Sequence, residues 1–203
     1  MRTAVLFEPE ELLFDTLMLR ANALQTALEA EGFSADLSAI RHLHAGVPSL
    51  VALTSIAMHS RIDTTAFELV LRRASDAFRS AIGASPPSFD PEAASAVVRL
   101  ASEFPLGVVT RGEREDTQRL LEQAGLDQCV SVIRSLGATA LSLHHTVWDD
   151  ARTTLRAARG IALVPAGLRD GARGAGLATP YSTGHASLHA LANADAGFVD
   201  SLF

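Results

Sequence analysis

The sequence predicts an α/β protein, a Rossmann-like doubly wound parallel sheet with an inserted helical cap. Three observations lead to this fold class. An apolar run at 3–7 ends directly in carboxylates, as expected of a buried parallel strand that opens onto a polar site. Residues 16–87 are dominated by helical spacing of apolar side chains. Beyond a Gly- and Pro-rich linker at 83–88, strand and helix patterns alternate, which favours a parallel sheet covered on both faces.

The inserted cap is expected to be mostly helical. Its first helix has apolar residues at helical spacing and a terminating glycine: Leu17, Ala21, Leu24, Leu28 and Gly32. Two further helices are expected over 36–60, with a break near 46–48, and another around 67–78. We therefore expect residues 1–15 and 88–203 to form the core domain and residues 16–87 to form the cap domain.

The core elements follow from capping residues and short apolar runs. Asp90 and Pro91 are typical of a helix start, with Asp as the N-cap and Pro at the first helical position. Helices are then expected over 114–124 and 146–159, ended by Gly125 and Gly160. The expected strands cover 106–110, 130–134 and 161–166, with short final strands at 177–179 and 197–199.

Composition limits the partners and the compartment. The net charge of −6 argues against binding to nucleic acid or to an anionic membrane. The single cysteine, Cys129, excludes an internal disulfide and a multi-cysteine zinc site, and we expect a buried thiol at a strand start. The first residues lack the pattern of a signal peptide, and no stretch approaches the roughly 20 apolar residues of a membrane span. A cytoplasmic protein is expected.

The strand-end segments, taken in order, resemble the haloacid dehalogenase superfamily, in particular phosphoglycolate phosphatase and β-phosphoglucomutase relatives with a cap after the first strand. Members open with a strand followed by Asp-x-Asp-Gly-x-x-x-Asp-Ser/Thr, and this chain has Glu8-Pro9-Glu10-Glu11 and, in register, Asp15-Thr16. A second family motif is a strand that ends in Ser or Thr, which 107–112 matches. The tail at 194–202 resembles the family's last strand and loop.

The resemblance implies catalytic positions at Glu8 and Glu10. In the family the first Asp attacks phosphorus and the second acts as acid and base. Both positions here keep a carboxylate on a side chain longer by one methylene, about 1.5 Å. A displacement of 1 Å can cost about 100-fold in rate, and Glu11 replaces the usual glycine, so the substitutions argue against efficient turnover. The alternative is a solvated acidic loop at a strand end.

The resemblance also implies a phosphate-binding position at Thr110, Arg111 and Gly112. The Thr hydroxyl and the backbone N–H groups after it are suited to holding an anion. The alternative is an ordinary strand-end threonine that caps the following helix, with Glu113 completing a capping box. The two interpretations remain open at the level of sequence.

The residues that provide positive charge in the family, either directly or by binding Mg²⁺, are altered. Its third motif supplies a Lys, whereas all 17 basic residues of this chain are Arg and none falls within 141–148; Arg134 and Arg152 flank that stretch. Its fourth motif supplies an Asp for Mg²⁺, where this chain has Pro, Ala and Gly at 165–167. Asp170 is a weak metal candidate, with a helix-start carboxylate as the alternative.

These substitutions predict a catalytically degenerate relative of the family's hydrolases. We expect a non-enzymatic binding or regulatory protein without a cofactor, whose partner is an unidentified protein or a small anionic ligand. The alternative is a slow or altered phosphatase that acts on a small phosphate ester with Mg²⁺ and Glu8 in place of the nucleophilic Asp. The histidine pairs lack a third metal ligand and are expected in the cap or at the surface, and the single Trp and Tyr are expected to be packing residues: His42, His44, His144, His145, Trp148 and Tyr181.

Overall fold

A computed structural model describes most of the chain, in two compact units. The described residues are 2–10, 12–44, 49–60, 62–137, 139–180, 185–194 and 196–203. Predictions that concern Glu11, the break at 46–48, Tyr181 and Asp195 lie outside them. The first unit comprises Met1–Phe14 and Ser88–Phe203, and the second comprises Asp15–Pro87. No described helix is both long and apolar enough to cross a membrane.

The described strands of the first unit form one parallel sheet of four. Its strands are β1 (Thr3–Phe7), β2 (Leu106–Thr110), β3 (Val132–Ser135) and β4 (Arg159–Leu163), in the spatial order β3-β2-β1-β4. β1 is central, and Val5 pairs with both Leu106 and Ile161. A strand with neighbours on both edges and helices on both faces has no exposed side, so all five residues of β1 are buried.

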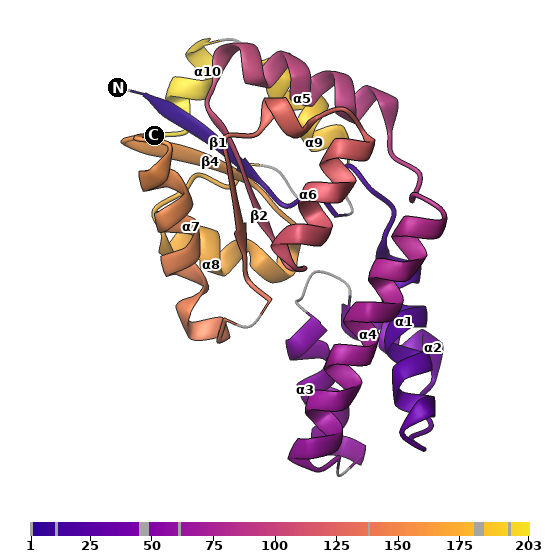
Figure 1. Ribbon diagram of the computed structural model, residues 1–203. Helices are drawn as coiled ribbons and strands as arrows, with labels where there is room; N and C mark the ends of the chain where they lie inside the picture. The colour runs from indigo at the N-terminus through magenta and orange to yellow at the C-terminus, as the bar shows by residue number, and fades with distance from the viewer. Residues whose placement is uncertain are drawn as a thin grey trace. The chain divides into compact units, whose positions relative to one another are not determined.

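Helices cover both faces of this sheet, so the predicted fold class is confirmed (Figure 1). α7 (His144–Thr154) and α8 (Arg169–Gly174) lie on one face, where Trp148 packs with Leu6 in a buried apolar cluster. α5 (Pro91–Glu103) and α6 (Arg114–Gln123) cover the other face, and α5 also packs on α9 (His185–Ala192). Alternation along β1 sends successive apolar side chains to opposite faces.

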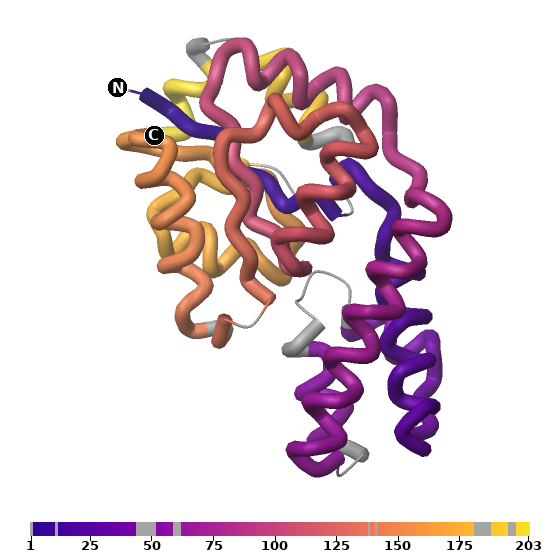
Figure 2. The backbone as a smooth tube through the Cα atoms, in the orientation of Figure 1, coloured from indigo at the N-terminus to yellow at the C-terminus, as the bar shows by residue number. Residues whose placement is uncertain are grey.

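The described residues of the second unit contain four helices and no strand. They are α1 (Leu17–Ala30), α2 (Leu37–His44), α3 (Ser49–Ser60) and α4 (Thr64–Ala84). α1 packs along α4 around an apolar cluster that includes Leu24, Leu28 and Val70. Figure 2 follows the chain out of β1, through these helices and back into α5. The unit is therefore an insertion between the first strand and the rest of the core.

The helix and strand expected around Gly160 begin and end elsewhere. α7 covers His144–Thr154 rather than 146–159, and the turn after it is made by Arg156, which has a φ of +53°. Gly160 lies within β4, paired with Ala4. A Cβ at Gly160 would meet the Leu177 side chain at 2.6 Å, so packing against Leu177, rather than helix termination, favours glycine here.

Other expected elements also differ. A strand was expected at 197–199, in the tail that resembles the family's last strand. These residues instead form part of α10 (Ala196–Ser201), because a short apolar run does not distinguish a strand from a buried helical turn. At 177–179 only Ala178 bridges to Ile161. β3 begins at Val132, so the half-buried Cys129 ends a 3₁₀ turn (Asp127–Cys129) instead of starting a strand.

Candidate functional site

The segment after β1 is held in a fixed conformation by its own backbone. The Glu8 N–H donates to the Leu163 carbonyl at 3.1 Å, which continues the pairing with β4. The Pro9 carbonyl then accepts from the N–H groups of Leu13 and Phe14, at 2.8 and 3.1 Å. The turn directs both glutamates inward: the Glu8 and Glu10 side chains are fully buried. For these two residues, the predicted alternative of a solvated acidic loop is therefore wrong.

Thr110 ends β2 and is fully buried. Its hydroxyl oxygen accepts from the Gly112 N–H at 3.1 Å and from the Thr117 hydroxyl at 2.9 Å. Glu113 is the N-cap of α6 but makes no capping hydrogen bond with its side chain, so the predicted capping box is absent. Thr110 thus fixes its own loop and binds the first turns of α6 through a hydroxyl pair that the sequence analysis did not anticipate.

Arg111 brings the two glutamates together. Its Nε atom lies 3.8 Å from Glu8 Oε1 and 3.8 Å from Glu10 Oε2, and all three side chains are buried. We refer to Glu8, Glu10 and Arg111 as the ion cluster. Two carboxylates and one guanidinium give it a formal charge of −1. Removing such charges from water is costly, so mutual attraction and further polar contacts must offset their desolvation.

The loop that carries Arg111 is also tied to β3. The Ser135 hydroxyl donates to the Gly112 carbonyl at 2.6 Å and accepts from the Gly137 N–H at 3.0 Å. The Leu136 N–H donates to the Thr110 carbonyl at 2.8 Å. These bonds hold the backbone on both sides of Arg111, and the end of the strand was their only signal in the sequence.

The other arginines considered from the sequence make different contacts. Arg134 pairs with Asp150 and donates to the Thr154 hydroxyl. Arg152 pairs with Asp149 and donates to the carbonyls of residues 157 and 158. Both are therefore engaged along α7 and the turn that follows it, whereas Arg111 lies beside Glu8 and Glu10.

The metal candidates differ in their exposure to solvent. Asp170 is exposed in the first turn of α8, whereas Glu8 and Glu10 are buried. Within the described part of the chain, no group of three or more His, Cys, Asp or Glu side chains is placed to hold a metal ion. His144 is buried against the core rather than at the surface as expected, and one of its ring nitrogens lies 3.2 Å from the Thr139 carbonyl. Desolvation lowers the pKa of His144, although this hydrogen bond opposes the shift.

Comparison with known proteins gives a likeness in structure. Neither a protein-family model nor a curated protein matches the sequence. CbbY from Rhodobacter sphaeroides, in complex with phosphate, has a TM-score of 0.73 at 19% identity, over 87% of this chain and 84% of that chain. A haloacid dehalogenase-like hydrolase family protein from Streptococcus pneumoniae has a TM-score of 0.72 at 16% identity, over 96% and 92%. The chain has the fold of the haloacid dehalogenase-like phosphatases.

A further neighbour on this fold is β-phosphoglucomutase from Clostridium difficile, with a TM-score of 0.72 at 15% identity over 88% of this chain and 83% of that chain. At identities this low the likeness concerns the fold, which the resemblance had predicted. The resemblance also implied a Mg²⁺ site at the carboxylates of the ion cluster. A guanidinium lies beside both carboxylates, and like charge opposes a second cation there.

Proposed function

We propose that this chain is a non-enzymatic binding protein built on the haloacid dehalogenase-like phosphatase fold. The observation that carries the proposal is the ion cluster, in which Arg111 lies 3.8 Å from a carboxylate oxygen of both Glu8 and Glu10. A nucleophile must reach its substrate along a defined line of attack. The Glu8 side chain is fully buried beside a guanidinium, so it is poorly placed for that role.

Charge favours the same conclusion. A phosphate ester approaching Glu8 brings negative charge towards a cluster that already carries a formal charge of −1. Enzymes that transfer phosphoryl groups offset this repulsion with metal ions and positioned cations. Arg111 is shared between two carboxylates, so less of its charge is available to a substrate. Loss of one preorganised stabilising group commonly costs about 100-fold or more in turnover.

The class of ligand that the chain binds is also a matter of proposal. Anion binding at Thr110, Arg111 and Gly112 is a prediction, and we expect it to be weak. Arg111 would have to exchange carboxylates for the new anion, and the Gly112 N–H already donates to Thr110. We therefore favour a protein partner as the ligand, because its binding does not require the ion cluster to open.

Activity assays test the proposal. Purified protein with Mg²⁺ is assayed against phosphoglycolate, sugar phosphates and an aryl phosphate, beside Glu8→Gln and the matched exposed control Glu68→Gln. We expect wild type and both variants to give the same background rate. The proposal would be overturned by turnover near the enzyme median of about 10 s⁻¹. Glu8→Gln would have to abolish this turnover and Glu68→Gln retain it, and the chain would then be an altered phosphatase.

A second test does not depend on the choice of substrate. A ligand present at 100 times its Kd stabilises a protein by about 2.7 kcal/mol. We expect Mg²⁺ to leave the unfolding midpoint of the first unit unchanged. This midpoint is measured by the fluorescence of Trp148, which is the sole tryptophan. A rise of several degrees that Glu8→Gln removes would show a metal site and contradict the proposal.

A further inference from the structure

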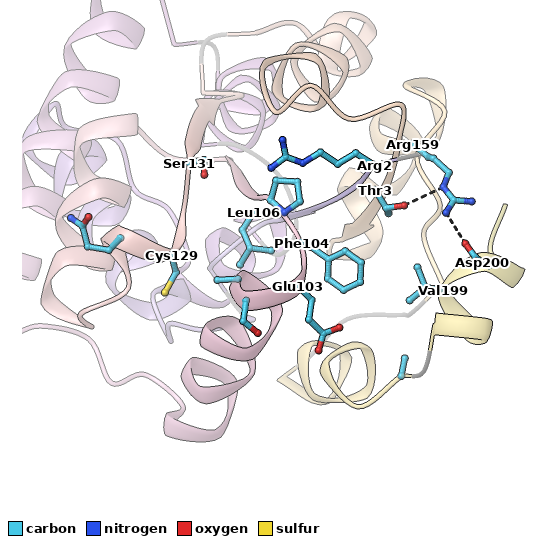
Figure 3. Close-up of a pocket in the computed structure, with 15 residues that line it drawn as sticks. Arg2, Thr3, Glu103, Phe104, Leu106, Cys129, Ser131, Arg159, Val199 and Asp200 are labelled. Carbon is cyan, nitrogen blue, oxygen red and sulfur yellow. Dashed lines mark hydrogen bonds and ion pairs between the residues drawn. The ribbon is translucent and has the colours of Figure 1, made fainter.

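A cavity of about 630 Å³ lies at the edge of the sheet opposite the ion cluster, within the first unit. It is bordered by the first residues of β1, β2 and β4, the end of α5 and residues of α10 (Figure 3). We call it the amino-edge pocket; its polar side chains include Arg2, Thr3, Glu103, Ser131, Arg159 and Asp200. Thr3 and Glu8 are five residues apart along an extended strand, about 16 Å. The pocket is thus separate from the candidate site.

One of the two arginines in this pocket is neutralised. Arg159 donates to an Asp200 carboxylate oxygen at 2.6 Å and to the Thr3 hydroxyl at 3.1 Å. Its guanidinium also lies 4.7 Å from the centre of the Phe203 ring. Arg159 therefore forms part of the wall, with its position and its charge both satisfied by neighbours.

Arg2 differs from Arg159. No ion pair joins Arg2 to a carboxylate among the residues that the structure describes. Figure 3 shows its guanidinium pointing away from Arg159, along the strand ends. Glu103 also borders the pocket, and its carboxylate lies on a different side from the Arg2 guanidinium in this view. The pocket thus offers one available cation while its total charge is balanced.

We propose that the amino-edge pocket binds a small organic monoanion, a carboxylate with an apolar body, through the guanidinium of Arg2. The carboxylate would accept charge-assisted hydrogen bonds from Arg2. Its apolar body would pack on the half-buried Phe104, since Leu106 and Val199 border the pocket but are themselves covered by the protein. Glu103 and Asp200 disfavour a ligand of higher negative charge. The volume lies within the usual range for small-molecule sites, about 300–1,000 Å³.

Cys129 provides a site-specific readout, because it borders the pocket and is the chain's sole cysteine. Burial raises the pKa of its thiol, and Asp127 adds to the shift, so alkylation is measured in mildly alkaline buffer. The rate of reaction with iodoacetamide is recorded with benzoate as the probe and with benzyl alcohol as its neutral counterpart. Because Arg2 is exposed, we expect a modest Kd of about 1 mM, so about 10 mM benzoate should slow alkylation roughly tenfold.

Two arginine variants decide the outcome. Arg2→Gln removes the proposed contact, and Arg72→Gln removes an exposed arginine from the second unit. Losing a hydrogen bond to a charged group should weaken benzoate binding at least about tenfold in Arg2→Gln, while Arg72→Gln behaves as wild type. The proposal is overturned if benzoate gives no protection, if benzyl alcohol protects equally, or if both variants are protected alike. Circular dichroism verifies that each variant is folded.

Discussion

Replacing Arg111 with methionine removes the cation of the ion cluster while keeping most of the side-chain volume. Each Arg–Glu contact spans 3.8 Å, which corresponds to about 4 kcal/mol of attraction at an effective dielectric constant of about 20. The two carboxylate oxygens share one nitrogen neighbour, so they lie no farther apart than twice 3.8 Å. Their mutual repulsion is then at least about 2 kcal/mol on the same scale.

These values are gross interaction energies, and the cost of removing the three charged groups from water offsets part of them. Breaking a buried ion pair by removing one partner commonly costs about 3–5 kcal/mol, which is the loss of unfolding free energy that we expect for Arg111→Met at pH 8. In a chain of this length, that corresponds to a decrease in Tm of roughly 6–20 °C.

Urea unfolding followed by Trp148 fluorescence measures this effect in the first unit alone. Trp148 is fully buried in the apolar cluster beneath α7, so its emission reports the core and not the inserted helices. Arg119→Met, an exposed substitution on α6, is the control and should change stability by less than about 0.5 kcal/mol. A loss below about 1 kcal/mol in Arg111→Met would refute the electrostatic account of the ion cluster.

Three further predictions follow from local geometry. Because burial lowers the pKa of His144 below its ordinary 6.5, the unfolded chain binds a proton more readily, and stability should fall as the pH decreases below about 6.5. His144→Gln should reduce the dependence of stability on pH, whereas His145→Gln, at an exposed position, should not. Urea titrations from pH 7 to 5 measure this dependence. Gly107→Ala would place a Cβ 2.7 Å from side-chain atoms of Leu6 and Val132, so it should cost about 1–3 kcal/mol in the same assay, and a neutral result would exclude this packing. Asp90 caps α5, and its Oδ1 accepts a hydrogen bond from the Glu92 N–H at 2.8 Å. Asp90→Ala removes this cap and should lower the free energy of unfolding by about 1 kcal/mol, and Asp90→Asn should recover most of this loss.

Local patterns determined most of the secondary structure. β1 and β2 were predicted with their observed bounds because each is a short apolar run that ends at a polar residue. Asp90 and Pro91 located the start of α5, since capping depends on the residues at the helix end itself. The same local signal failed at Gly160, where glycine is favoured by the Leu177 side chain, which leaves little room for a Cβ.

The sequence by itself determined the fold class and the carboxylates at the end of the first strand. It also brought Thr110, Arg111 and Gly112 under consideration as one loop. Only the tertiary structure decided that Arg111 lies beside Glu8 and Glu10, and that the glutamates are buried rather than solvated. The physical reason is distance along the chain: about a hundred residues separate the two loops, and the parallel pairing of β1 with β2 brings their ends together. No local pattern specifies which side chains then meet.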